Sequence, residues 1–274
     1  DLIPKSNIIR GNSIIGSTAY GIAVYMPSET EVESNNTIDS NTISAVVGTQ
    51  NSGNSGAGIY VVGAAASGTI VRANHIKNCC ISTTSETLAP AGIAISNTKR
   101  CKVTENDISG MTKYDGIRVV VCASIVVSGN TVKMPASNTT AVGGICVMNS
   151  TDSIVSSNAI EGETSCNRRM IAIRASAAKT TGTRVVGNTI KAGAAYAGID
   201  VFGTNLTTAV AEDTLISGNS IVVGSTNIPY RSAFAARTRF CDNTTNGGFA
   251  LYMENQAGFV ASGNALIAAG ATNT

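Results

Sequence analysis

The amino-acid sequence predicts an all-β solenoid, in which short parallel strands wind into stacked turns. Two observations support this fold class. An asparagine flanked by β-branched residues recurs along almost the whole chain, and Ile and Val together number 52 among 274 residues, against 6 Leu. β-Branched residues favour strands over helices, and a fixed period is typical of repeat architectures. The composition therefore disfavours a helical bundle.

The first repeated element has the pattern Φ-x-x-N-x-Φ, where Φ is usually Ile or Val. Its asparagines recur with a mean period of about 28 residues. We interpret each asparagine as the residue at a tight bend between two strands, where stacked side-chain amides satisfy backbone groups. The ten copies are centred on Asn12, Asn41, Asn74, Asn106, Asn130, Asn158, Asn188, Asn219, Asn243 and Asn264.

The second repeated element, G-I-x-V, precedes most of these asparagines. Each period therefore holds three apolar runs of strand length, separated by Gly, Ser, Thr and Asn. This arrangement predicts three strands per turn and about nine to ten turns. The copies begin at Gly21, Gly58, Gly92, Gly116, Gly144, Met170, Gly198 and Gly248, with a poorer copy near Phe234.

Through the bend asparagine and the G-I-x-V strand, residues 7–267 resemble the right-handed parallel β-helix proteins of the pectate-lyase-like superfamily, and bacteriophage tailspikes in particular. The resemblance implies a right-handed parallel β-helix with an asparagine ladder. It also implies that polysaccharide lies along the sheet formed by the first, G-I-x-V strands. A left-handed hexapeptide solenoid does not fit, because it has about 18 residues per turn and no bend asparagine.

No composition shift interrupts the repeat, so we expect residues 1–274 to form a single β-helix domain. The chain starts with Asp, and the small apolar segment Ala265–Ala271 makes a poor cap for a terminal turn. We therefore expect the chain to be a fragment of a longer one.

Charge, hydropathy and cysteine usage exclude several classes of function. The net charge is only +2, without a block of like charge, so we expect no nucleic-acid partner. Apolar stretches such as Val119–Ala123 are too short for membrane insertion. The seven cysteines include no C-x-x-C pair, which indicates reduced thiols. No metal-ligand spacing or cofactor motif occurs, so we expect neither a metal nor a cofactor.

Strand alternation places a mixed set of aromatic, basic and acidic residues on the outer face of the first-strand sheet. The seven tyrosines all lie near the starts of these strands. Flat amphipathic rings suit the faces of sugars, so we predict a stacking surface there. The predicted substrate-binding residues are Tyr60, Arg118, Arg169, Arg174, Phe202 and Tyr252.

Two carboxylates are candidates for catalysis. A glycoside hydrolase places them about 5–5.5 Å apart for retention or about 6.5–9.5 Å for inversion. Asp200 is the only acid at an outward first-strand position, and we predict that Arg174 keeps it ionised as base or nucleophile. Glu163, in the loop before the preceding turn's first strand, is the predicted proton donor. The alternative is a structural ion pair between Asp200 and Arg174. His75 has no acid at an obvious spacing and is expected to be a surface residue.

These features leave three functions open. The first is a virion tailspike domain, acting as a homotrimer, that binds bacterial capsule or O-antigen polysaccharide and hydrolyses it. The second is a receptor module that binds glycan without cleaving it. The third is a lyase or C5-epimerase of uronic-acid polymers, in which Arg118 and Arg174 supply the base or neutralise the carboxylate.

Overall fold

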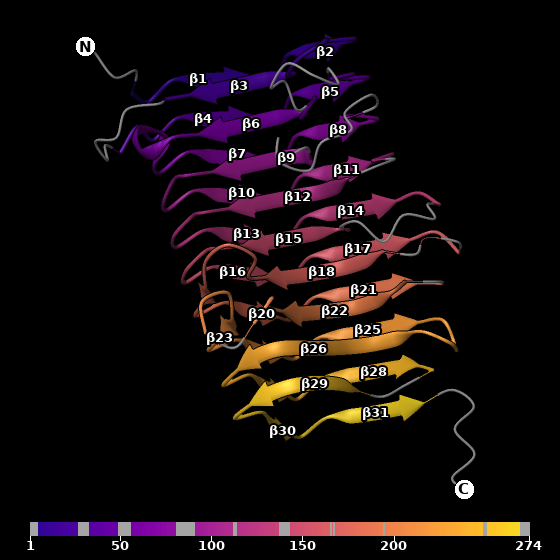
Figure 1. Cartoon of the computed structure of the whole chain (residues 1–274). Helices are drawn as coiled ribbons and strands as arrows, with labels where there is room; N and C mark the ends of the chain where they lie inside the picture. The colour runs from indigo at the N-terminus through magenta and orange to yellow at the C-terminus, as the bar shows by residue number, and fades with distance from the viewer. Residues whose placement is uncertain are drawn as a thin grey trace, which may run out of the picture.

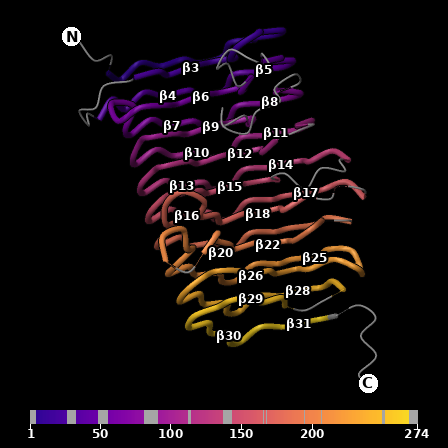
Figure 2. Tube along the Cα trace, in the orientation of Figure 1, coloured from indigo at the N-terminus to yellow at the C-terminus, as the bar shows by residue number. Residues whose placement is uncertain are grey.

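The chain winds into a solenoid of stacked turns in the computed structural model (Figure 1). The trace in Figure 2 shows the turns following one another from the N-terminal end to the C-terminal end. The structure describes residues 5–26, 33–48, 56–80, 91–111, 114–136, 143–164, 166, 168–193, 195–205, 207–248 and 251–268.

Three parallel sheets run the length of the solenoid, and we name them A, B and C in the order in which the chain first enters them. Sheet A contains β1 (Ile8–Arg10), β4 (Thr37–Asp39), β7 (Ile70–Arg72), β10 (Lys102–Thr104), β13 (Val126–Ser128), β16 (Ile154–Ser156), β20 (Arg184–Val186), β24 (Leu215–Ser217), β27 (Arg239–Cys241) and β30 (Val260–Ser262). Sheet B contains β2 (Ser13–Ile15), β5 (Thr42–Ser44), β8 (His75–Lys77), β11 (Asp107–Ser109), β14 (Thr131–Met134), β17 (Ala159–Gly162), β21 (Thr189–Ala192), β25 (Ser220–Val223), β28 (Thr244–Gly247) and β31 (Ala265–Ala268).

Sheet C is built from the G-I-x-V strands. It contains β3 (Ile22–Tyr25), β6 (Ile59–Val62), β9 (Ala91–Ser96), β12 (Asp115–Val120), β15 (Ile145–Met148), β18 (Arg169–Arg174), β22 (Ala197–Phe202), β26 (Ile228–Ala236) and β29 (Tyr252–Ala257), and it is extended by β19 (Thr180–Thr181) and β23 (Ala211–Glu212). In the described part of the chain, sheets A and B have ten strands each, and the three sheets confirm the predicted three-stranded turns.

The core is a stack of β-branched side chains. Ile38 of sheet A, Ile43 of sheet B and Ile93 of sheet C have no exposed surface, and their equivalents one turn away pack above and below them. Burying one such side chain contributes about 1.5–3 kcal/mol. The apolar runs therefore fold as strands because only the strand alternation turns every second residue inward.

The predicted asparagine ladder forms the bend between sheets A and B. Asn158 donates from its backbone N to Asn188 Oδ1 at 3.0 Å and from Nδ2 to the same oxygen at 2.9 Å, and its side chain also reaches Val127 O. The ladder continues in both directions from Asn12 to Asn264. The residue before each ladder asparagine has a positive φ, for example 54° at Ser157 and 65° at Gly187. This left-handed residue turns the chain, and the asparagine satisfies the backbone groups that the turn leaves unpaired.

The glycine of G-I-x-V lies where sheets B and C pack closely together. A Cβ atom added at Gly92 would lie 2.7 Å from Cγ2 of Ile108 and 2.8 Å from the carbonyl oxygen of Gly116. Any side chain there would push the two sheets apart, so the repeated glycine is a packing requirement.

The remaining sequence expectations concern cysteines and helices. All seven cysteines are free thiols, as predicted, and only Cys241 is not buried. The described part of the chain contains one helix, the 3₁₀ turn η1 (Ala64–Ala66), and none long and apolar enough to cross a membrane.

Candidate functional site

The outer face of sheet C carries a column of side chains in register, one from each turn, which we call the central column. Charged and aromatic side chains follow one another in its last three positions, on β22, β26 and β29. From β3 to β29 the central column is Ala23, Tyr60, Ala94, Arg118, Cys146, Ala172, Asp200, Arg231 and Tyr252.

Asp200 is held between two arginines. Its side chain has no exposed surface, Arg169 Nε donates to Oδ2, and Arg231 Nη1 lies 3.1 Å from Oδ1 and 3.3 Å from Oδ2. Burial raises the pKa of the Asp200 carboxyl above its ordinary value, and the charges of Arg169 and Arg231 oppose that rise. Both carboxylate oxygens are thus engaged in orienting the two guanidinium groups.

Aromatic rings enclose these guanidinium groups from several sides. The Arg169 guanidinium carbon lies 5.0 Å from the ring centre of Tyr196 and 4.8 Å from that of Phe202. Arg231 lies 5.7 Å from Tyr196 and 5.8 Å from Tyr252. Stacking of this kind holds a planar cation in place against the rings. We call Asp200, Arg169, Arg231, Tyr196, Phe202 and Tyr252 the sheet C cluster.

A second carboxylate borders the sheet C cluster. Glu254 on β29 has 42% of its side chain exposed, and its Oε2 lies 3.8 Å from Arg231 Nη2. Arg231 therefore links a buried acid, Asp200, to an exposed one. Neither Arg231 nor Glu254 was among the predicted site residues.

The arginine beside Asp200 was predicted wrongly. Arg174 pairs in register with Phe202 and lies 5.5 Å from its ring, while Arg169 and Arg231 make the ion pairs with Asp200. The poorer copy of the pattern was placed near Phe234, but in β26 it is Tyr230 and Ser232 that are buried, and Arg231 pairs in register with Asp200.

The strand pairing in the last turn of sheet C also differs from the prediction. Tyr252 pairs with Arg231 and so lies in the central column, whereas the G-I-x-V pattern placed it two residues further on, in line with Phe202. Residues 249 and 250 of the predicted last copy lie outside the described residues.

Two predicted substrate-binding residues lie on higher rungs. Tyr60 stacks on Tyr20 with ring centres 4.9 Å apart and an interplanar angle of 14°. Arg118 is only 4% exposed, and its Nε lies 3.9 Å from Asp115 Oδ2. This burial does not favour direct contact between Arg118 and a substrate.

Not all the tyrosines lie on the outer face. Tyr114 belongs to the hydrophobic core, and Tyr230 is fully buried with its ring 4.5 Å from that of Phe240. The predicted stacking surface thus loses these two rings and keeps Tyr196 and Tyr252 at the sheet C cluster.

Glu163 lies at the end of the sheet B strands. Its Oε2 accepts a hydrogen bond from Ala136 N at 3.0 Å, and it lines a groove of about 490 Å³ together with Lys77, Lys133 and Glu161. Among the contacts of the described residues, none joins Glu163 to Asp200. Their role as a catalytic pair stays a prediction.

The structure also pairs His75, which was expected to lack an acidic partner. His75 Nδ1 lies 3.0 Å from Asp107 Oδ2 on the outer face of sheet B, and both side chains are about half exposed. The two residues are neighbours in register one turn apart. Within the described ranges, no group of three or more His, Cys, Asp or Glu side chains is placed to hold a metal ion.

Comparison with solved structures identifies similar folds at low sequence identity. The full-length tailspike protein 2 from Escherichia coli O157:H7 bacteriophage CAB120 matches with a TM-score of 0.51 and 12% identity, over 94% of this chain and 34% of that chain. The Dettilon tailspike protein matches with a TM-score of 0.52 and 11% identity, over 95% of this chain and 55% of that chain. DFA-IIIase from Arthrobacter chlorophenolicus A6 matches with a TM-score of 0.55 and 12% identity, over 96% and 66%. These likenesses show the fold, and the chain spans only part of each protein.

A family comparison assigns the repeat itself. The sequence matches no curated protein. A family model described as "Right handed beta helix region" matches residues 3–142 and 89–234, which is more than half of the chain. The stacked three-stranded turns and the asparagine ladder agree with that match, and the chain belongs to the right-handed β-helix family.

Proposed function

We propose that this chain is the β-helix domain of a bacteriophage tailspike, which binds bacterial capsule or O-antigen polysaccharide along the outer face of sheet C and depolymerises it. The observation that supports this proposal is the sheet C cluster, where Tyr196, Phe202 and Tyr252 surround Arg169 and Arg231. Aromatic rings present flat apolar faces to sugars, and guanidinium groups donate in a fixed geometry to hydroxyl or carboxylate oxygens.

The contrast with the other sheets supports this location. In the described strands of sheets A and B the only Phe, Tyr or Trp is Phe240, which is buried in the core. Ser, Thr and Lys dominate the outer face of sheet B instead, as in β14, β21 and β25. Within the described strands, aromatic side chains outside the core are therefore confined to sheet C, which supports this location for the proposed binding surface.

Most glycoside hydrolases use two carboxylates at the glycosidic bond. The proposal retains Asp200 and Glu163 as the predicted pair and adds Glu254, because that side chain is exposed beside the sheet C cluster. In this scheme the proton for the leaving oxygen comes from the acid whose carboxyl group is least engaged in other contacts. Asp200, with both oxygens on arginines, is suited to hold Arg169 and Arg231 against the substrate.

The engagement of Asp200 also favours a second function, a tailspike receptor module that binds glycan without cleaving it. A reducing-end assay on purified capsule and O-antigen polysaccharides distinguishes the two. Hydrolysis releases reducing ends without ultraviolet absorbance, a lyase releases ends that absorb, and a binding module releases none. Asp200→Asn, Glu163→Gln and Glu254→Gln identify the acid required. Absence of both binding and cleavage on every polysaccharide would contradict the proposal.

We also propose that the chain assembles as a homotrimer within the virion. This part of the proposal follows from the likeness of the fold to bacteriophage tailspikes. Sedimentation equilibrium is expected to give three times the mass of one chain, and a monomer at micromolar concentration would contradict this assembly.

A further inference from the structure

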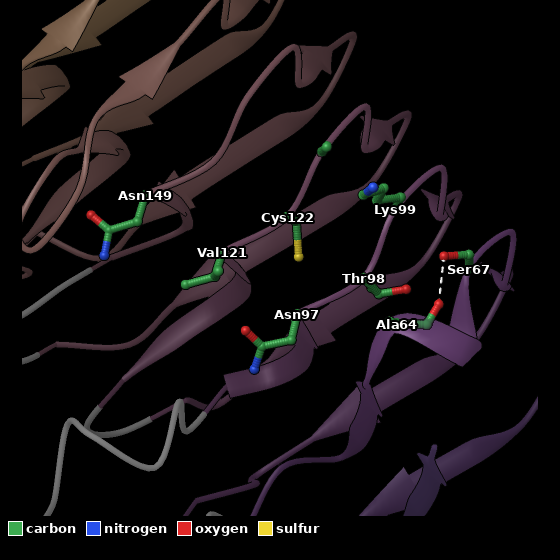
Figure 3. A pocket seen from close by; sticks show the side chains of 9 residues that line it. Ala64, Ser67, Asn97, Thr98, Lys99, Val121, Cys122 and Asn149 are labelled. Atoms are coloured by element: carbon green, nitrogen blue, oxygen red, sulfur yellow. Dashed lines mark hydrogen bonds between the residues drawn. The ribbon is translucent and has the colours of Figure 1, made fainter. Parts of the chain in front are cut away.

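A groove outside the sheet C cluster lies at the corner between sheets C and A (Figure 3). Its volume is about 380 Å³, and Asn97, Val121, Cys122 and Asn149 are among the residues that line it. Asn97, Val121 and Asn149 directly follow β9, β12 and β15, so they occupy the same position on three successive turns. Figure 3 shows their side chains projecting from the ribbon on the same side, with Val121 between the two amides. We call these three residues the corner triad.

Val121 has an unusual backbone conformation for its residue type. Its φ is 53°, and it is the one β-branched residue with a positive φ in the described part of the chain. Asn97 and Asn149, at φ of 51° and 49°, are residues that tolerate this region. Val121 is also 51% exposed, so burial does not compensate for the strain. Strain of this kind is typical of sites where the side chain itself serves a function.

The amides on either side of Val121 keep part of their hydrogen-bonding capacity. In the described part of the chain, Asn97 Nδ2 donates to Ser96 Oγ at 3.3 Å and Asn97 Oδ1 accepts nothing. Asn149 Oδ1 accepts from Ser176 N at 2.9 Å and from Ala178 N at 3.4 Å, and its Nδ2 donates to Ser176 Oγ at 3.3 Å. These bonds fix the orientation of the Asn149 amide and leave its second N–H group for a ligand.

The corner triad combines an exposed apolar group with two amides, and these groups match the chemistry of one uncharged sugar ring. An exposed isopropyl group packs against the C–H face of a pyranose, while amides donate to and accept from hydroxyl groups. Turns of the solenoid are about 4.8 Å apart, so the two amides stand two turns apart, on either side of the exposed Val121 side chain. We propose that the corner triad is a carbohydrate subsite that holds one neutral sugar unit of the polysaccharide. The inference rests on the proposed function and extends its binding path to the turns of β9, β12 and β15.

Two substitutions test the subsite in opposite ways. Val121→Gly removes both the isopropyl group and the backbone strain, so it is expected to raise the thermal midpoint and to weaken polysaccharide binding about tenfold. The double variant Asn97→Ala/Asn149→Ala is expected to weaken binding by at least as much. The matched control is Ser157→Gly, which relieves a positive φ of 54° at the ladder corner and is expected to leave binding unchanged.

The probes are immobilised capsule and O-antigen polysaccharides, first tested with the wild-type protein and then with the variants by biolayer interferometry. If Val121→Gly and the double variant bind within about twofold of wild type while Tyr252→Ala loses binding, the subsite is overturned and the proposed function stands. If the wild-type protein binds no polysaccharide, both fall together. Weaker binding by the two corner variants, with Ser157→Gly unchanged, supports the subsite.

Discussion

The asparagine ladder and the sheet C cluster both bury polar side chains, but they do so in different ways. Asn158 of the ladder is 1% exposed and forms neutral hydrogen bonds that recur at every turn from Asn12 to Asn264. Asp200 of the cluster is fully buried and forms charged contacts with Arg169 and Arg231 that involve only three turns. The uniform ladder provides hydrogen bonds that the backbone needs at every bend. The charged cluster is local, and because buried ion pairs contribute little net stability, its presence requires an explanation other than stability.

The largest expected effect is at the cluster. Asp200→Ala leaves two mostly buried guanidinium groups without their shared carboxylate, and removing one partner of a buried pair costs about 3–5 kcal/mol. Urea unfolding is the measurement. The charge-conserving control Asp200→Glu is expected to recover part of the loss, and wild-type stability in Asp200→Ala would show that the arginines have other partners of equal strength.

The ladder is expected to respond less strongly at each position. Asn158→Ala leaves the backbone N of Asn130 and the carbonyl of Val127 without their side-chain partner, which costs about 1–3 kcal/mol. The matched control is Asn97→Gly, because Asn97 is exposed and has a positive φ that glycine accepts. Equal destabilisation by the two substitutions, measured by urea unfolding, would remove the distinction between structural and exposed asparagines.

The pH dependence of stability distinguishes the contribution of charged contacts from that of the ladder amides, which do not titrate. The pKa of Asp213 is lowered by its hydrogen bonds to Arg237, and that of Asp39 is lowered by Ser40 and then by Arg72 and Arg10. A lowered pKa contributes stability that is complete at neutral pH and is lost as pH falls through the folded-state pKa.

The wild-type protein is therefore expected to lose stability below about pH 4, as measured by the urea midpoint. The double variant Asp39→Asn/Asp213→Asn is expected to lose less over the same range. Parallel pH profiles for the two proteins would contradict a role for these carboxylates.

The smallest expected effect is the alkylation of buried cysteines, including one on sheet C. Burial raises the pKa of Cys146, in the central column, to about 12 and that of Cys79 to about 11. Both are expected to resist alkylation in the native state, while Cys241, which is only partly buried, reacts. Mass spectrometry after iodoacetamide treatment counts the modified sites. Rapid modification of Cys146 would show that the face beside Arg118 is open to solvent.

The sequence was sufficient to predict the fold because the requirements of the fold repeat. Each ladder asparagine meets the same bend, and each glycine such as Gly92 meets the same close approach of sheets B and C. The asparagines and the glycines therefore recur at a fixed period, which can be recognised in a single sequence. The G-I-x-V glycines also indicated which strands form sheet C.

The site was predicted less completely because it departs from the repeat. In β26 the pattern becomes Pro229-Tyr230-Arg231-Ser232, with an aromatic side chain in the core, so Arg231 could not be aligned with Asp200. The contact between His75 and Asp107 was missed for a related reason, because turn lengths vary and the two residues are 32 apart in the chain. Contacts between turns depend on which residues of adjacent turns are paired. Because the loops vary in length, this pairing cannot be predicted from the sequence alone.

Polysaccharide affinity of matched variants on two sheets tests the central claim most directly. Tyr252→Ala removes an exposed ring of the sheet C cluster, and Lys191→Ala removes an exposed side chain from the outer face of sheet B. With folding verified by thermal melting, Tyr252→Ala is expected to weaken binding at least about tenfold, while Lys191→Ala binds as wild type does. Wild-type affinity in Tyr252→Ala, together with a loss in Lys191→Ala, would contradict the assignment of the binding surface to sheet C.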